Sequence, residues 1–157
     1  MKTILIGHRG AMELEPENTL ISFREALRYP YVKMIEFDVQ RAITGEIVVI
    51  HDEKLNRTTN GKGEVKKKTF SYIRSLNAGK GEKIPTLEEV LDLINKKISV
   101  NIELKAKNTA KEVAETIKLY KRKGWKIENF LVSSFDQAEL IKFKELMNEV
   151  PIGLIFS

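Results

Sequence analysis

The chain has 157 residues, of which 42% are hydrophobic and 31% are charged, and its formal net charge is +5. A chain of this length and composition can bury a substantial core, which excludes a wholly disordered protein and favours a single domain over residues 1–157. It contains no cysteine, which excludes disulfides and thiol chemistry.

The apolar and basic residues bear on location and partners. No run approaches the roughly 18 apolar residues of a membrane span. The N-terminus lacks the pattern of a signal peptide, so we expect a cytoplasmic location. An excess of 27 basic over 22 acidic residues fits an anionic small-molecule substrate, and it fits a merely solvated surface as well. There is no nucleic-acid-binding motif and no interleaving of aromatic and basic residues, so we expect no nucleic-acid partner.

Short apolar segments alternate with helical patterns along the chain. Six segments are predicted to be strands: residues 3–6, 34–39, 47–50, 99–104, 130–133 and 152–155. Four are predicted to be helices: residues 19–28, 86–95, 110–123 and 137–148. Thr86, with Glu89 three residues later, predicts a capping box at the start of the second helix. The alternation of strands and helices predicts an α/β fold with a parallel sheet covered by helices.

One connection departs from this alternation. Between residues 39 and 47 there is room only for a turn, which contains Thr44 and Gly45. The segment 52–85 that follows the third predicted strand is rich in glycine, lysine and threonine and has no clear periodicity. We interpret it as a loop excursion from the sheet, with a short helix near residues 70–76.

Two predicted strands carry acidic residues where a parallel sheet is usually apolar on both faces. Glu36 and Asp38 are two residues apart, so they share one face of their strand, and Glu103 occupies a similar position two strands later. Either strand alone could simply have a polar exposed face. Together, the three carboxylates predict an oxygen-rich site for a hard divalent cation, Mg²⁺ or Ca²⁺, in preference to zinc.

The two histidines of the chain each follow a strand-like segment and each precede a charged residue. Histidine titrates near neutral pH, so His8 and His51 can act as a general acid and a general base in one displacement. Arg9 and Lys105 supply positive charge for an anionic group, most naturally a phosphate. A cation, two histidines and two basic side chains together indicate hydrolysis of a phosphoryl ester.

Several short motifs carry a family resemblance. In chain order they are GHRG at 7–10, PENT at 16–19, IEFDV at 35–39, HD at 51–52, IPTLEEVL at 84–91 and NIELK at 101–105. In this order and at these separations, the sequence resembles the glycerophosphodiester phosphodiesterase family. The resemblance implies a TIM-barrel enzyme that hydrolyses glycerophosphodiesters to glycerol 3-phosphate and an alcohol.

The resemblance also assigns roles to individual side chains. By role, these are acid–base catalysis by His8 and His51, phosphate contact by Arg9 and Lys105, metal binding by Glu36, Asp38 and Glu103, and a place in the substrate pocket for Phe135. A core position is the alternative for Phe135. Glu17 and Asn18 of PENT are interpreted as structural residues that hold the loop after the first strand and cap the first helix. Segment 52–85 matches a small insertion that family members carry after the third strand.

The sequence departs from the family in its length, because it ends after the sixth predicted strand, within IGLIF at 152–156. We therefore expect an incomplete (β/α) barrel with about six of eight strands and without the last two β/α units. Its open edges are expected to be covered by a partner or a second copy. The alternative function is a truncated, inactive barrel that binds metal or phosphate, or that acts only in an assembly. A lysophospholipid or phosphoinositide substrate is ranked below small soluble diesters.

Overall fold

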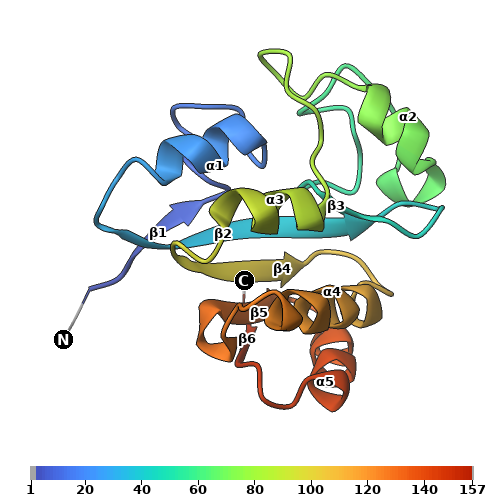
Figure 1. Cartoon of the computed structure of the whole chain (residues 1–157). Coiled ribbons are helices and arrows are strands. Elements are labelled where there is room, and N and C mark those ends of the chain that lie inside the picture. Colours follow the sequence, from blue (N-terminus) through green and yellow to red (C-terminus); the bar gives the residue numbers. More distant parts are fainter. Residues whose placement is uncertain (1–2, 157) are drawn as a thin grey trace.

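A computed structural model describes residues 3–156, and its central feature is an open six-stranded sheet (Figure 1). The strands are β1 (Leu5–His8), β2 (Val32–Arg41), β3 (Ile47–Val49), β4 (Ser99–Leu104), β5 (Phe130–Ser134) and β6 (Ile152–Leu154). Five of them are parallel in the order β1-β2-β4-β5-β6, and β3 pairs only with β2. The predicted parallel α/β sheet is confirmed, and each predicted strand is present with small shifts in its bounds.

The direction of β3 corrects the expectation of a uniformly parallel sheet. β3 runs antiparallel to β2, with Val39 opposite Val49. The connection between them is a tight turn in which the Ala42 amide donates to the Glu46 carbonyl at 2.9 Å and Gly45 adopts a φ of 110°. A turn of this length can join antiparallel strands, whereas parallel strands need a crossover of about a dozen residues or more. The hairpin therefore carries the chain past the C-terminal end of β2.

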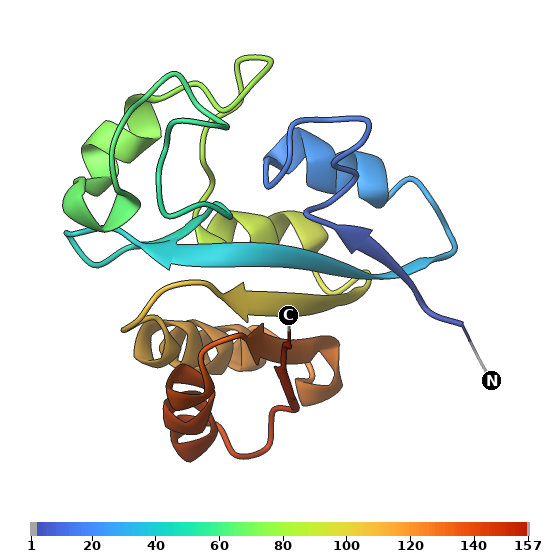
Figure 2. The same ribbon diagram turned by 180° about the vertical axis from the view of Figure 1, so that it is seen from behind.

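Helices cover one face of the sheet, as the views from the front and from behind show (Figures 1 and 2). They are α1 (Leu20–Ala26), α2 (Phe70–Ser75), α3 (Leu87–Ile94), α4 (Ala110–Arg122) and α5 (Gln137–Leu146), with 3₁₀ turns η1 (Val65–Lys67) and η2 (Ile127–Asn129). The capping box at Thr86 and Glu89 is confirmed, with both hydrogen bonds formed at 3.2 and 2.9 Å. None of the helices within residues 3–156 is both long and apolar enough to cross a membrane.

The alternation of side chains along β2 separates the core from the opposite face of the sheet. Ile35, Phe37 and Val39 are completely buried in the main apolar core, together with residues of the covering helices. The intervening residues Glu36 and Asp38 project from the other face. The same alternation in β4 buries its apolar residues in that core, so the polar residues of both strands share one surface.

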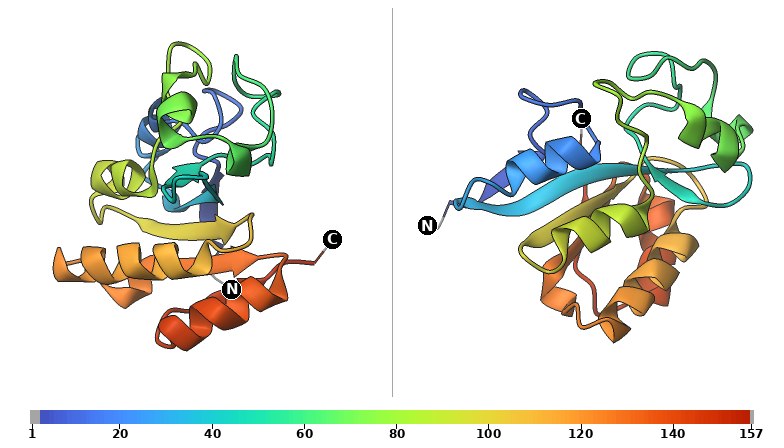
Figure 3. Two further views of the ribbon diagram at one scale, coloured as in Figure 1. Left: turned by 90° about the vertical axis from the view of Figure 1, so that its right-hand side faces the viewer. Right: turned by 45° about the horizontal axis from the view of Figure 1, so that its top comes forward.

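The segment between β3 and α3 forms a small subdomain with an apolar cluster of its own, which stands beyond the C-terminal ends of the strands (Figures 1 and 3). Leu55, Val65 and Ile73 are fully buried there. Arg74 of α2 donates two hydrogen bonds to Glu89 of α3, at 2.6 and 2.5 Å, which ties the subdomain to the helical layer. The short helix predicted near residues 70–76 is confirmed as α2.

The two edges of the described sheet are apolar and exposed. Leu5 and Ile6 of β1 are about half exposed, and Ile152 and Leu154 of β6 are also exposed. Unpaired strand edges with apolar side chains are surfaces on which another strand can add.

Candidate active site

The predicted site residues of β1, β2 and β4 meet at the C-terminal ends of these strands. His8 is the last residue of β1 and lies opposite Glu36 of β2, and Asp38 lies opposite Glu103 of β4. Parallel strands bring their carboxyl ends to the same edge of a sheet, where barrel enzymes gather their reactive groups. The strand register thus explains why residues far apart in sequence become neighbours.

The carboxylates of Glu36, Asp38 and Glu103 form a buried cluster. Each offers one oxygen atom, and these oxygens all lie within 4.8 Å of one another. Glu36 Oε1 and Asp38 Oδ1 are buried without a hydrogen-bond partner. Burial first, and the neighbouring Asp38 carboxylate next, raise the pKa of Glu36 to about 7. Unpaired, mutually repelling oxygens suit a hard divalent cation, so these residues fit the metal that the sequence predicts.

Arg9 and Lys105 lie against this cluster, each beside a different carboxylate. The Arg9 amide donates to Glu36 Oε2 at 3.0 Å, and its guanidinium Nε lies 3.4 Å from Asp38 Oδ2. Lys105 Nζ donates to Glu103 Oε1 at 2.8 Å. Arg9 takes up a left-handed backbone conformation with a φ of 51°, which turns the chain directly after β1. Both predicted phosphate contacts therefore border the cluster from opposite sides.

His8 and His51 occupy different surroundings. The His8 side chain is 60% exposed, and its Nε2 lies 3.7 Å from Glu36 Oε2. The His51 side chain is half-buried, and its Nδ1 lies 2.7 Å from Asp52 Oδ1. Hydrogen bonds from Arg57 first, and from His51, hold the pKa of Asp52 well below its usual range. An ionised carboxylate only accepts, so Nδ1 of His51 is the donor and Nε2 is left to exchange a proton.

Ion pairs connect the His51 side of the site to the Arg9 side. Arg57 donates to both oxygens of Asp52 at 2.8 Å and to both oxygens of Glu17 at 2.7 and 2.8 Å. Glu17 also accepts a hydrogen bond from Arg9 Nη1 at 3.0 Å. Within residues 3–156 no hydrogen bond joins His8 to His51 directly, so this chain of charges is what links their neighbourhoods.

The PENT motif contributes more to the site than the sequence suggested. The expectation that Glu17 and Asn18 cap the first helix is wrong, because Thr19 is the N-cap of α1. Asn18, with a φ of 57°, donates from Nδ2 to Asp38 Oδ2 at 2.9 Å. Sequence reasoning also missed Arg57. It lies in a segment without periodicity, and only its position shortly after the His-Asp pair could have drawn attention to it.

Phe135 lies on the site side of the sheet rim. Its side chain is about half exposed, which excludes the core alternative. The amine of Lys105 stands 5.2 Å from the centre of its ring, a cation–π contact. Phe135 therefore orients one of the two predicted phosphate-binding residues.

Comparison with known proteins places this geometry in a family. Residues 8–157 match the model of the glycerophosphoryl diester phosphodiesterase family. The chain belongs to that family. A glycerophosphodiester phosphodiesterase of Caldanaerobacter subterraneus subsp. tengcongensis is 39% identical over 99% of this chain and 68% of its own length. One of Bacillus subtilis is 34% identical over 96% of this chain and 58% of its own length.

Solved structures agree with this membership. An Oleispira antarctica phosphodiesterase in complex with sn-glycerol-3-phosphate has a TM-score of 0.88 and 32% identity, over 99% of this chain and 66% of that one. A glycerophosphodiester phosphodiesterase of Agrobacterium tumefaciens has a TM-score of 0.85 and 32% identity, over 96% and 66%. The fold is thus of the TIM-barrel type, as expected, with an incomplete barrel. The chain spans about two thirds of the length of these relatives.

The carboxylate cluster makes stability depend on pH and on metal. In EDTA, we expect the free energy of unfolding to fall as the pH rises from about 4.5 to about 7, because the pKa of Glu36 is about 7 in the folded chain against an ordinary 4.5. Glu36→Gln should remove this loss and be more stable than the wild type at pH 8, by up to about 3 kcal/mol. Mg²⁺ or Ca²⁺ should raise the Tm of the wild type at pH 8 but not that of the variant.

Chemical and thermal unfolding at pH 5 and pH 8, with and without the ion, measure these differences. Glu115→Gln is the matched control, since Glu115 is an exposed residue of α4. Identical pH profiles and identical responses to metal in the wild type and Glu36→Gln would contradict the assignment of the cluster.

Proposed function

We propose that this chain hydrolyses glycerophosphodiesters to glycerol 3-phosphate and an alcohol with the help of a divalent cation. The observation that carries the proposal is the cluster of three buried carboxylates with unpaired oxygens, bordered by Arg9 and Lys105 and adjacent to His8. Membership of the phosphodiesterase family supports it. The glycerol 3-phosphate bound to the Oleispira antarctica relative supports the proposed product.

In this proposal Glu36, Asp38 and Glu103 hold Mg²⁺ or Ca²⁺. When bound, such an ion neutralises charge on the phosphoryl oxygens and polarises them. Arg9 and Lys105 now pair with the carboxylates that would become metal ligands. Once the ion has taken over neutralisation of the carboxylates, these two side chains are free to contact the phosphate. Asn18 keeps Asp38 oriented throughout, because the amide uses its own hydrogen bond.

The histidines supply the proton transfers. One takes the proton of the attacking hydroxyl, and the other gives a proton to the alcohol oxygen as its bond to phosphorus breaks. The Asp52 carboxylate fixes the tautomer of His51 and presents its Nε2 for this purpose, while His8 faces solvent at the rim. The attacking hydroxyl is that of water or of the neighbouring glycerol carbon, and either histidine can act first. The geometry is compatible with each of these routes.

The arrangement of the chain enters the proposal in two ways. We infer that residues 1–157 act as a single domain in which the insertion 52–85 carries Arg57 and thereby holds His51 in place. The partner is a small glycerophosphodiester, and a cytoplasmic location stays a prediction. The alternative function, binding of metal or phosphate without turnover, draws on the open edges of the sheet.

Replacing His51 by alanine is expected to lower turnover by a factor of about 10² to 10⁴, because it removes one of the two proton carriers. The assay measures glycerol 3-phosphate released from glycerophosphocholine and glycerophosphoethanolamine, with Mg²⁺ or Ca²⁺ against EDTA. The half-buried position of His51 predicts a Tm close to that of the wild type. Turnover that survives in His51→Ala would refute the catalytic role, and metal binding without turnover in the wild type would favour the alternative function.

The sheet edges lead to a proposal on assembly, in which β1 or β6 pairs with a second copy of the chain. Both edges expose apolar side chains and unpaired backbone groups, which a second copy can satisfy. We expect sedimentation velocity to show a dimer or a larger closed species at micromolar concentration. Leu154→Lys on β6 should weaken it, whereas Leu119→Lys on the outer face of α4 should not. A wild-type monomer at all concentrations would contradict this part of the proposal.

A further inference from the structure

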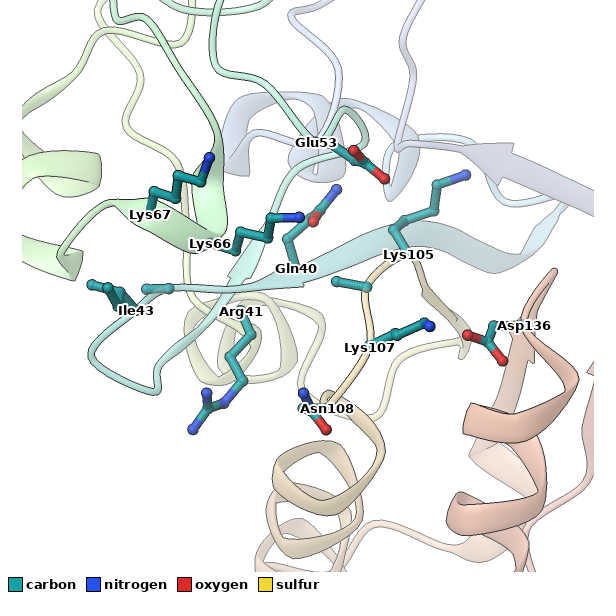
Figure 4. Close-up of a pocket in the computed structure, with 12 residues that line it drawn as sticks. Gln40, Arg41, Ile43, Glu53, Lys66, Lys67, Lys105, Lys107, Asn108 and Asp136 are labelled. Atoms are coloured by element: carbon teal, nitrogen blue, oxygen red, sulfur yellow. The ribbon is translucent and has the colours of Figure 1, made fainter.

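A cleft of about 650 Å³ lies beside the carboxylate cluster, at the C-terminal rim of the sheet (Figure 4). Its walls come from the end of β2, from η1 in the insertion, and from the loops that follow β4 and β5. Five of its lining residues are basic and two are acidic: Arg41, Lys66, Lys67, Lys105 and Lys107 against Glu53 and Asp136. The proposed catalytic role uses only Lys105 of this set, so the remaining positive charge is unexplained.

The basic residues of the cleft differ in how firmly they are paired. Arg41 binds Glu112 at 3.1 Å and points away from the Gln40 side of β2 in Figure 4, and Lys67 binds Glu64 at 2.7 Å. Lys66 is only loosely paired, with Nζ 3.4 Å from Glu64, and it extends toward Gln40. Lys107 has no ion pair with any residue in the described part of the chain. Lys66 and Lys107 are therefore the cations most available to a ligand.

The acidic residues do not cancel this charge. Asp136 is the N-cap of α5, and its carboxylate accepts hydrogen bonds from the backbone amides of Ala138 and Glu139 at 2.9 and 3.2 Å. Glu53 is the one acidic side chain of the lining that is not held in this way among residues 3–156. The cleft thus presents an excess of positive charge to whatever enters it.

The cleft and the carboxylate cluster are continuous. Gln40 follows Asp38 by two residues on the same face of β2, so it continues the line of Glu36 and Asp38 outward to the floor of the cleft. Its buried amide donates to the His51 carbonyl at 3.1 Å. Lys105 belongs to both places, since it pairs with Glu103 and lines the cleft. A substrate whose phosphorus lies at the cluster can extend one of its two ester groups along this line.

We propose that the cleft receives the alcohol part of the substrate and selects an alcohol that carries a further phosphate group, which Lys66 and Lys107 bind. This inference rests on the proposed phosphodiesterase function and deepens it. A quaternary ammonium alcohol would call for a cage of aromatic rings, and none of the residues that line the cleft is aromatic. The nearby ring of Phe135 already faces the amine of Lys105. Charge and lining therefore both favour an anionic alcohol.

The first test compares kcat/KM for glycerophosphoinositol and glycerophosphoinositol 4-phosphate, which differ by a single phosphate. In 20 mM salt, the wild type should prefer the phosphorylated diester by about fivefold or more, and 0.5 M NaCl should reduce this preference. The double variant Lys66→Ala/Lys107→Ala should bring the ratio close to one. Lys62→Ala/Lys118→Ala changes the net charge equally outside the cleft and should keep the wild-type ratio. A wild-type ratio of one or less, or the same ratio in both double variants, would overturn the inference.

A second test separates this inference from the proposed function, because it needs no turnover. Calorimetry with inositol 4-phosphate, inositol and inorganic phosphate should show binding of the first that is lost in Lys66→Ala/Lys107→Ala and retained in the control variant. Hydrolysis of neither diester, with this binding present, would refute the phosphodiesterase function and leave the cleft as an anion site. No binding of inositol 4-phosphate, or equal binding of inorganic phosphate, would refute selection of a phosphorylated alcohol.

Discussion

Repulsion among three buried carboxylates is the constraint on which the rest of the site depends. Burying Glu36, Asp38 and Glu103 together carries a high free-energy cost unless positive charge meets them. The chain meets them in part with Arg9 and Lys105, and a divalent cation would complete the neutralisation. A site with this unmet need is already organised for ligands that bring or share positive charge, which is the requirement for handling a phosphate diester.

The fold meets this constraint by dividing the work between sheet and insertion. The parallel strands fix the carboxylates through their register, and the apolar faces of β2 and β4 anchor that register in the core. The insertion contributes Arg57, whose bonds to Asp52 and Glu17 orient His51 and join it to Arg9. The same insertion forms one wall of the basic cleft. Metal site, proton carriers and substrate specificity thus depend on how the insertion packs against the rim.

Much of the fold and the site could be predicted from the sequence, for physical reasons. The carboxylates stood out because charges two residues apart within a strand must share a face, and the capping box at Thr86 is a strictly local pattern. The antiparallel direction of β3 was missed although its short connection required it. The roles of Asn18 and Arg57 depend on contacts across 20 and 40 residues of sequence, which no local pattern records.

The most direct test of the central claim is a crystal structure of the chain with Mn²⁺, a substitute for Mg²⁺ that can be located by its anomalous scattering, and with glycerol 3-phosphate. The account predicts one ion between Glu36, Asp38 and Glu103, with the phosphate beside it and in contact with Arg9 and Lys105. An ion bound elsewhere, or a phosphate held apart from these carboxylates, would contradict the account.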